Sequence, residues 1–261
     1  MTASVASRRS IAGLALFSAL IVALTVSLGV WQLQRRVEKH ALIAALTERI
    51  AAAPIELPPP RDWAQLTPAN DEFRRVSFAA RYANEPDAMV YSSGSAIRRD
   101  VSGPGTWAFM PAQLAGGARV VVNAGFVPNT LQDRAQQDRA TTPLRTGEAV
   151  ELTGYLRFPE TGGALTAAAD AGKRLWFARD VAEMAATLGW GEVAPFYIDL
   201  EAPVPASGVP KPGPLSVRLK DDHLQYAITW FGLAATVAIG FAVWLLGQRR
   251  RPHGSRRSAS L

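Results

Sequence analysis

Two long runs of uncharged, mostly apolar residues lie near the two ends of this 261-residue chain. Residues 11–30 and residues 226–247 contain no Asp, Glu, Lys or Arg. An α-helix rises about 1.5 Å per residue, so each run can cross roughly 30 Å, the thickness of a bilayer's hydrocarbon core. The pattern predicts two transmembrane helices, which hold the residues between them on one side of a membrane.

The net charge of +6 comes from the two tails. The residues between the tails include 21 Lys and Arg and 22 Asp and Glu, so their net charge is −1. The seven remaining basic residues are Arg8, Arg9, Arg249, Arg250, Arg251, Arg256 and Arg257. Tails rich in Arg stay on the cytoplasmic side, so both termini are predicted inside and the main domain outside. The cluster Arg35, Arg36 and Lys39 opposes this orientation, but long translocated segments follow the charge rule poorly. The basic excess therefore indicates topology, and no nucleic-acid partner is expected.

The chain is predicted to divide into six segments. The first apolar run exceeds the usual 7–15-residue core of a signal peptide and ends at Trp31, which favours an uncleaved anchor. Beyond Trp31, apolar residues recur at spacings of three to five, which predicts that the helix continues toward Pro54. The predicted segments are a cytoplasmic tail (1–10), a transmembrane helix (11–31), an amphipathic extension (32–53), a β-rich domain (54–222), a second transmembrane helix (223–248) and a basic cytoplasmic tail (249–261).

The middle of the chain has the period of β-strands. Val76, Phe78, Ala80 and Tyr82 alternate with more polar residues, as in a half-buried strand. Further strands are predicted at 88–92, 106–112, 119–123, 150–158 and 196–200, with a helix at 181–188 between Asp180 and Gly189. The fold class is thus a membrane protein with two transmembrane helices flanking a mostly antiparallel β (α+β) extracytoplasmic domain. With no cysteine, that domain depends on its apolar core and has no disulfide.

Residues for catalysis are scarce, so we expect no enzyme, no catalytic residue and no bound metal ion held by a side-chain cluster. The chain has only three histidines, His40, His223 and His253, and none has a histidine or cysteine partner at metal-ligand spacing. A serine-hydrolase triad would have to use His40 or His223, both of which lie next to the predicted spans. A periplasmic hydrolase therefore finds no support in the sequence.

The outer end of the second apolar run carries three notable side chains. His223, Tyr226 and Trp230 have i, i+3 and i+7 spacing, so they share one helix face. Together with Trp31 they fit an aromatic belt at a membrane interface. The alternative is that His223 offers its imidazole to a cofactor or partner, and spacing leaves both interpretations open.

Four motifs in order resemble those of the Surfeit locus protein 1 family of cytochrome c oxidase assembly factors. They are Gly29-Val-Trp-Gln-Leu-Gln-Arg35, Val122-Asn-Ala-Gly-Phe-Val-Pro128, Gly154-Tyr-Leu-Arg157 with Pro195-Phe-Tyr-Ile-Asp199, and Asp222-His-Leu-Gln-Tyr-Ala-Ile-Thr-Trp-Phe231. The resemblance covers about residues 14–248. Three positions depart from the family pattern: Asp222 replaces Asn, Ala124 replaces Arg, and Phe126 replaces Trp.

The resemblance implies help in building the haem–copper centre of a terminal oxidase in the cell (inner) membrane. It makes non-covalent haem a the implied cofactor, with His223 as the candidate axial ligand and His40 as the other histidine nearby. It also implies contacts through Trp31, Gln32, Arg35, Tyr226 and Trp230. The implied partners are the oxidase subunit that carries the haem–copper centre, the haem a synthesis machinery and membrane lipids. The alternative is a scaffolding protein of the cell envelope resembling polysaccharide co-polymerases, which would need long coiled-coil extensions.

Overall fold

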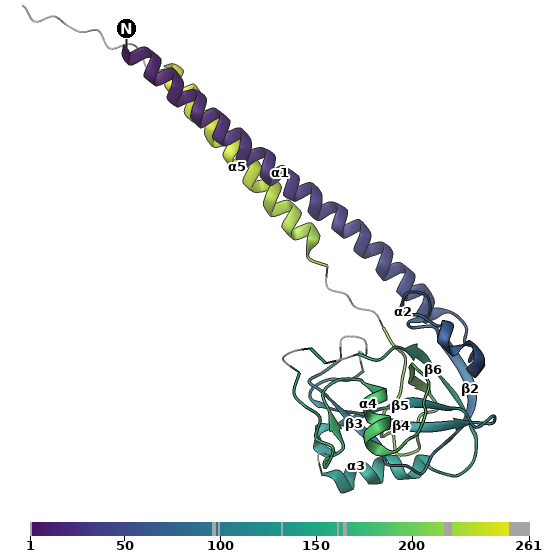
Figure 1. Cartoon of the computed structure of the whole chain (residues 1–261). Coiled ribbons are helices and arrows are strands. Elements are labelled where there is room, and N and C mark those ends of the chain that lie inside the picture. The colour runs from purple at the N-terminus through teal and green to yellow at the C-terminus, as the bar shows by residue number, and fades with distance from the viewer. Residues whose placement is uncertain are drawn as a thin grey trace, which may run out of the picture. The chain divides into compact units, whose positions relative to one another are not determined.

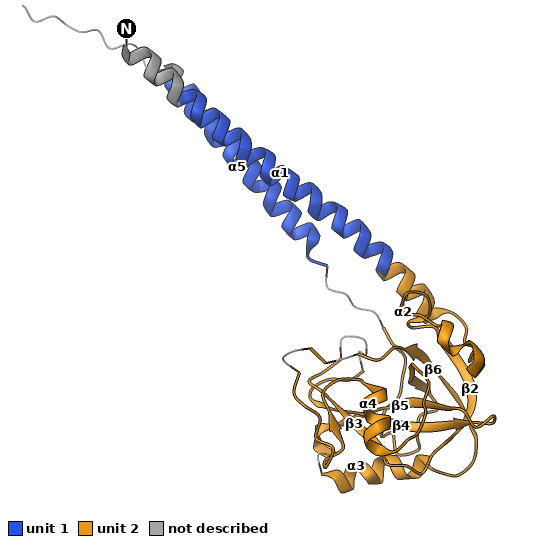
Figure 2. Cartoon of the chain, viewed as in Figure 1, with its two compact units in different colours: residues 1–42, 220–261 blue, residues 43–219 orange. Residues whose placement is uncertain are grey.

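The computed structural model describes residues 2–95, 98, 100–131, 133–160, 162–163, 166–216 and 221–250. The chain forms two compact units (Figure 2). The helical unit comprises Met1–Leu42 and Lys220–Leu261, and the β unit comprises Ile43–Leu219.

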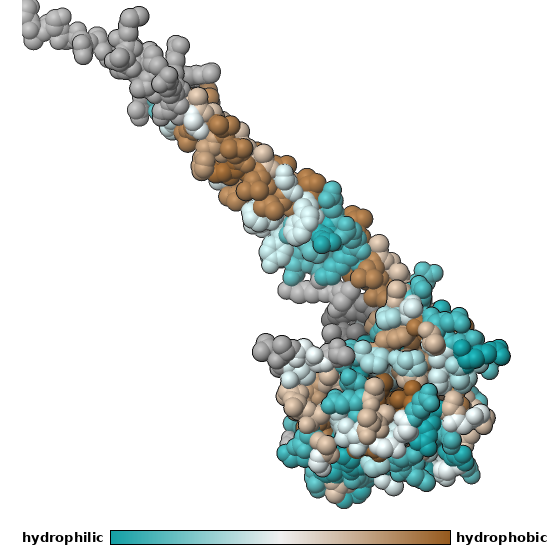
Figure 3. All heavy atoms as spheres, in the orientation of Figure 1, coloured by the Kyte–Doolittle hydropathy of each residue, from teal (hydrophilic) through white to brown (hydrophobic). Residues whose placement is uncertain are grey.

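The described part of the helical unit consists of residues 2–42 of helix α1 (Thr2–Ala51), residues 221–222 and helix α5 (His223–Arg250). The two helices lie side by side (Figure 1). Both are long and apolar enough to cross a membrane by length and composition. Only 11% and 6% of their most apolar windows are buried, so protein does not cover most of these side chains. Figure 3 shows apolar side chains gathered along this helix pair, whereas polar ones dominate the β unit. Helix α1 continues beyond Trp31 to Ala51.

Small residues allow the two helices to pack. Thr25 is 3% exposed, and its hydroxyl donates to the carbonyl of Ile21 four residues earlier, so it leaves no polar atom unpaired. On α5, Ala227 and Ala234 are buried at a spacing of seven residues, or two helical turns. The contact between the helices therefore runs along one face of each.

The β unit is built on a closed five-stranded barrel. The barrel strands, in order around it, are β2 (Arg75–Tyr82), β6 (Val150–Arg157), β8 (Tyr197–Ala202), β5 (Arg119–Pro128) and β4 (Gly105–Leu114). Strand β4 pairs back onto β2 through Tyr82 and Ala112, which closes the ring. Among the described strands, five pairings are antiparallel and three are parallel, so the predicted mostly antiparallel character is confirmed.

Shorter elements surround the barrel. They are β1 (Ile55–Glu56), β3 (Ala88–Ser92), β7 (Leu175–Trp176), α2 (Pro68–Asp71), α3 (Arg134–Thr141), α4 (Val181–Leu188) and three 3₁₀ turns (Pro60–Gln65, Asn129–Leu131 and Thr142–Leu144). The last turns of α1 also belong to this unit, because Arg49 Nη1 donates to the Glu72 carbonyl at 2.9 Å.

Alternate strand residues fill the barrel. Val76, Phe78, Ala80 and Tyr82 of β2 all point into the core, with exposed fractions between 0% and 7%. Side chains of Phe196, Ile198 and Leu200 meet them from the far side of the ring. The period-two pattern seen in the sequence is therefore the pleat of a strand with one buried face.

A second apolar layer covers part of the outside of the barrel beneath α4. Met184 of α4 is fully buried against a cluster that includes Trp107, Trp176 and Tyr197. Asp180 caps α4 by accepting from the backbone N–H groups of residues 182 and 183, and Gly189 ends it with φ 70°. Both ends agree with the sequence prediction, because capping chemistry is local.

Candidate functional site

Two neighbouring acidic residues, Asp221 and Asp222, hold the start of α5. Asp221 Oδ1 accepts the backbone N–H of His223 at 3.0 Å, and the Asp222 carbonyl accepts the N–H of Tyr226 at 3.1 Å. Acidic side chains suit this position because the first N–H groups of a helix are unpaired and carry partial positive charge. The backbone of His223 is thus fixed in the first turn of α5.

The imidazole of His223 contacts α1 directly. Its Nδ1 lies 2.7 Å from Oε1 of Gln32, although 191 positions separate the two residues in the sequence. Both side chains are half-buried. A carboxamide oxygen accepts hydrogen bonds, so this contact is a hydrogen bond in the tautomer that carries its proton on Nδ1. In that tautomer of the neutral ring, Nε2 carries the lone pair. The structure thereby brings together two of the residues that the sequence analysis singled out.

A second polar contact lies on the same side of α1. His40 Nε2 lies 2.6 Å from Asp221 Oδ2, and Arg36 Nε lies 3.7 Å from the same oxygen. Partial burial raises the pKa of the Asp221 carboxyl, but the His223 backbone N–H and the His40 imidazole outweigh that effect, so the pKa lies below its ordinary value. Asp221 is therefore an anion, and its two carboxylate oxygens contact the His223 backbone on α5 and the His40 ring on α1.

The remaining predicted contact residues lie more toward the outside. Trp31 is 48% exposed and Tyr226 is 55% exposed, while Trp230 is half-buried. Arg35 pairs with Glu38 at 2.8 Å, and its guanidinium lies 5.9 Å from the Trp31 ring centre. These side chains do not enter the Gln32–His223 pair.

Arg36 and Asp221 belong to this polar group, but the sequence analysis named Arg36 only for its charge and gave Asp221 no site role. One signal was available for α1, because Thr25, Gly29, Gln32 and Arg36 follow each other at spacings of four, three and four, the spacing of one helix face. No comparable pattern marks Asp221, because it precedes the helix.

The family-like motifs of the β unit meet in a different, buried network. Asp199 of β8 accepts from Asn123 Nδ2 at 2.7 Å and from Arg157 Nη1 at 2.9 Å. All three residues are at most 6% exposed. Burial lowers the pKa of the Arg157 guanidinium, but Tyr197, Asp199 and Glu72 outweigh burial and raise it, so this cation is fully charged. The motif residues therefore tie β5, β6 and β8 together.

The glycine of the central motif is needed for a close backbone approach. Gly125 has φ +130°, and a Cβ atom there would lie 2.3 Å from the backbone carbon of Lys211. Phe126 pairs with Lys211 in an antiparallel bridge at this point. Any larger residue at position 125 would separate the two segments.

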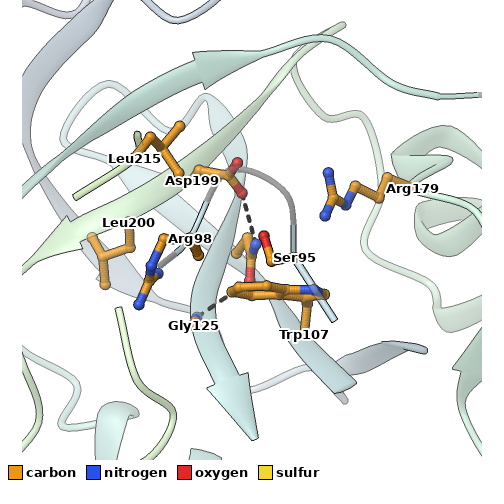
Figure 4. A pocket seen from close by; sticks show the side chains of 9 residues that line it. Ser95, Arg98, Trp107, Gly125, Arg179, Asp199, Leu200 and Leu215 are labelled. Atoms are coloured by element: carbon orange, nitrogen blue, oxygen red, sulfur yellow. Dashed lines mark hydrogen bonds between the residues drawn. The ribbon is translucent and has the colours of Figure 1, made fainter. Parts of the chain in front are cut away.

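A cavity of about 10 Å³ lies beside this network (Figure 4). Arg98 and Arg179 lie on either side of the Trp107 ring in this view, 5.7 and 6.0 Å from its centre. Such a volume holds about one water molecule, so the cavity does not accommodate an organic substrate. Within the part of the chain that the structure describes, no three His, Asp or Glu side chains form a cluster able to hold a metal ion.

Comparison with known proteins matches a region of the chain that contains both polar groups to one family. The model of the SURF1 family matches residues 19–235, which include Gln32, Asp199 and His223. A SURF1-like protein from Drosophila melanogaster is 34% identical over 88% of this chain and 77% of the relative. Surfeit locus protein 1 from Takifugu rubripes is 31% identical over 88% and 96%, and its human counterpart is 31% identical over 87% and 76%. This chain belongs to the SURF1 family.

Proposed function

We propose that this protein is a membrane-anchored assembly factor for a haem–copper terminal oxidase, a cytochrome c oxidase, and that it acts without turning over a substrate. Membership of the SURF1 family supports the assembly role, given the oxidase assembly factors that the motifs resemble. The observation that carries the proposal is the Gln32–His223 pair, which brings the first and last motifs into contact beside two apolar helices. An assembly factor of this kind needs a surface that contacts its partner and a side chain that binds the cofactor, more than it needs a reactive side chain.

The proposed anchor consists of α1 and α5 as a multi-pass hairpin in the cell (inner) membrane, in contact with its lipids. Many of their apolar side chains, such as Leu16 (63%) and Phe17 (60%), are largely exposed, and that exposure would be costly in water. The basic tails favour cytoplasmic termini, which would put the β unit outside.

The proposed cofactor is haem a, held non-covalently. The residues present suit it, because Nδ1 of His223 is engaged by Gln32 and Nε2 is left as a basic nitrogen. His40 is less suited, since its Nε2 is already taken by Asp221. His223 would hold a bound haem, and the haem would supply an iron able to accept an imidazole nitrogen. The haem a synthesis machinery would be the donor, and the oxidase subunit with the haem–copper centre would be the acceptor.

The envelope-scaffold alternative gains no support from the β unit. In its described residues, the helices between α1 and α5 have at most eight residues, and the main element is a barrel. A coiled-coil scaffold needs far longer heptad segments.

Deleting the gene in its native host tests the proposal. Terminal oxidase activity and haem a absorbance in membranes should both fall, while synthesis of the oxidase subunits continues. Expression of the intact chain from a plasmid should restore both signals. Unchanged oxidase activity in the deletion strain would reject the assembly role.

A further inference from the structure

The two histidines that the structure describes, His40 and His223, differ in which ring nitrogen is engaged. In His40 the engaged atom is Nε2, 2.6 Å from a carboxylate oxygen of Asp221. In His223 the engaged atom is Nδ1, 2.7 Å from the amide oxygen of Gln32. His253 lies outside the described residues.

The contact with Gln32 favours one tautomer of His223. A neutral imidazole has one N–H group and one lone pair, on opposite nitrogens. The Gln32 oxygen has no proton to give, so it stabilises the ring only when Nδ1 carries the proton. The free ring in water interconverts between two tautomers, and this hydrogen bond selects the one whose Nε2 can donate its lone pair to a metal.

The same contact also fixes the direction of the ring. Gln32 lies on α1, and His223 lies in the first turn of α5. The backbone N–H of His223 donates to Asp221. The imidazole is thus held at Nδ1 and through its backbone, which leaves little freedom of rotation. Histidines that bind metals are typically oriented this way, by a partner that accepts their second N–H.

We infer that Gln32 is a positioning residue for His223: its side-chain oxygen holds the imidazole in the Nδ1–H tautomer and presents Nε2 as the nitrogen that binds haem iron. This inference rests on the haem ligation given under Proposed function. Gln32 itself touches no haem in this scheme, and its effect is transmitted through the ring of His223.

Three variants separate positioning from packing. Gln32→Leu removes the acceptor and keeps a side chain of similar length. Gln32→Glu keeps an oxygen acceptor at the same place. Gln34→Leu is the matched control, because Gln34 lies two residues further along the same helix and is exposed. Circular dichroism of each detergent-solubilised full-length protein checks that the helices are intact.

Two measurements follow on these proteins. Titration with haem a, read from its visible spectrum, should show about 10- to 100-fold weaker binding for Gln32→Leu, near-normal binding for Gln32→Glu and no change for Gln34→Leu. Nitrogen-15 NMR of histidine-labelled protein without haem should show His223 protonated at Nδ1 in the wild type, and a mixture of tautomers in Gln32→Leu.

The possible failures are distinguishable. A wild-type protein that binds no haem would overturn the proposed ligation itself. Wild-type binding that is unchanged in Gln32→Leu, or a wild-type His223 protonated at Nε2, would overturn the role of Gln32 and leave the assembly function standing.

Discussion

Gly29 of α1 lies against the aromatic ring of Phe231 of α5, so closely that a Cβ atom at position 29 would come within 2.7 Å of two ring carbons. The ring thus packs against helix backbone. Gln32 follows Gly29 by one turn, and the close approach of the helices there allows its side chain to reach His223.

Gly29→Ala is therefore expected to weaken the helix pair. The added methyl group must displace the Phe231 ring, and overpacking of this kind costs about 1–3 kcal/mol. Thermal unfolding of the detergent-solubilised protein should begin at a lower temperature than in the wild type. Gly13→Ala serves as control, because a Cβ there meets nothing within 4 Å. Equal stability of the two variants would show that the ring moves at no cost.

Replacing His223 by Ala is expected to reduce the haem that co-purifies with the protein and to lower oxidase activity in the host. The reason is the loss of the only imidazole in the described residues whose Nε2 has no hydrogen bond to a carboxylate. His40→Ala should keep most of the haem, since its Nε2 is directed to Asp221. Haem retention by His223→Ala equal to that of the wild type would refute the ligand assignment.

The basic tails lead to a prediction about topology. Epitope tags at either terminus should be protected from protease in intact cells, while the β unit should be cleaved once the outer barrier is opened. Immunoblots before and after lysis of the cells measure this. Cleavage of either tag in intact cells would contradict the orientation.

Asp199→Ala is expected to destabilise the β unit severely. The substitution removes the buried carboxylate that accepts from both Arg157 and Asn123, and leaves Arg157 only its less buried partners Glu72 and Glu160. Breaking a buried ion pair from one side costs about 3–5 kcal/mol. Asp170→Ala is the control, because its partner Lys173 is largely exposed and surface pairs contribute little. Near-ultraviolet circular dichroism measures the loss of tertiary structure on heating. This loss should occur at a clearly lower temperature only in Asp199→Ala.

Acid should destabilise the β unit, partly through Asp100. Hydrogen bonds from Arg98 hold the pKa of the Asp100 carboxyl well below its ordinary value of 3.8. A group whose pKa is lower in the folded state adds stability above its unfolded pKa, and this stability is lost as pH falls below about 4. Asp100→Asn should therefore show a smaller drop in melting temperature between pH 6 and pH 3 than the wild type. An identical drop in both proteins would exclude this contribution.

Several elements could be predicted from the sequence because their signals are local. The apolar runs, the alternation from Val76 to Tyr82 and the Asp180–Gly189 caps each depend on residues within a few turns of one another. Helix α3 was missed because the segment Arg134–Thr141 is polar and has no apolar period. Strand β5 was predicted only as far as Asn123, yet it continues to Pro128, where its pairing with β4 extends past a bulge.

The sequence by itself determined two long apolar helices, a β-rich middle and the resemblance to one family, because composition, period and motif order are properties of the chain. Only the tertiary structure decided that Gln32 meets His223, that His40 turns to Asp221, and that β4 closes onto β2. These contacts depend on the rotation of one helix against another and on strand register. Both are fixed by packing between segments far apart in the chain, where a local pattern carries no information.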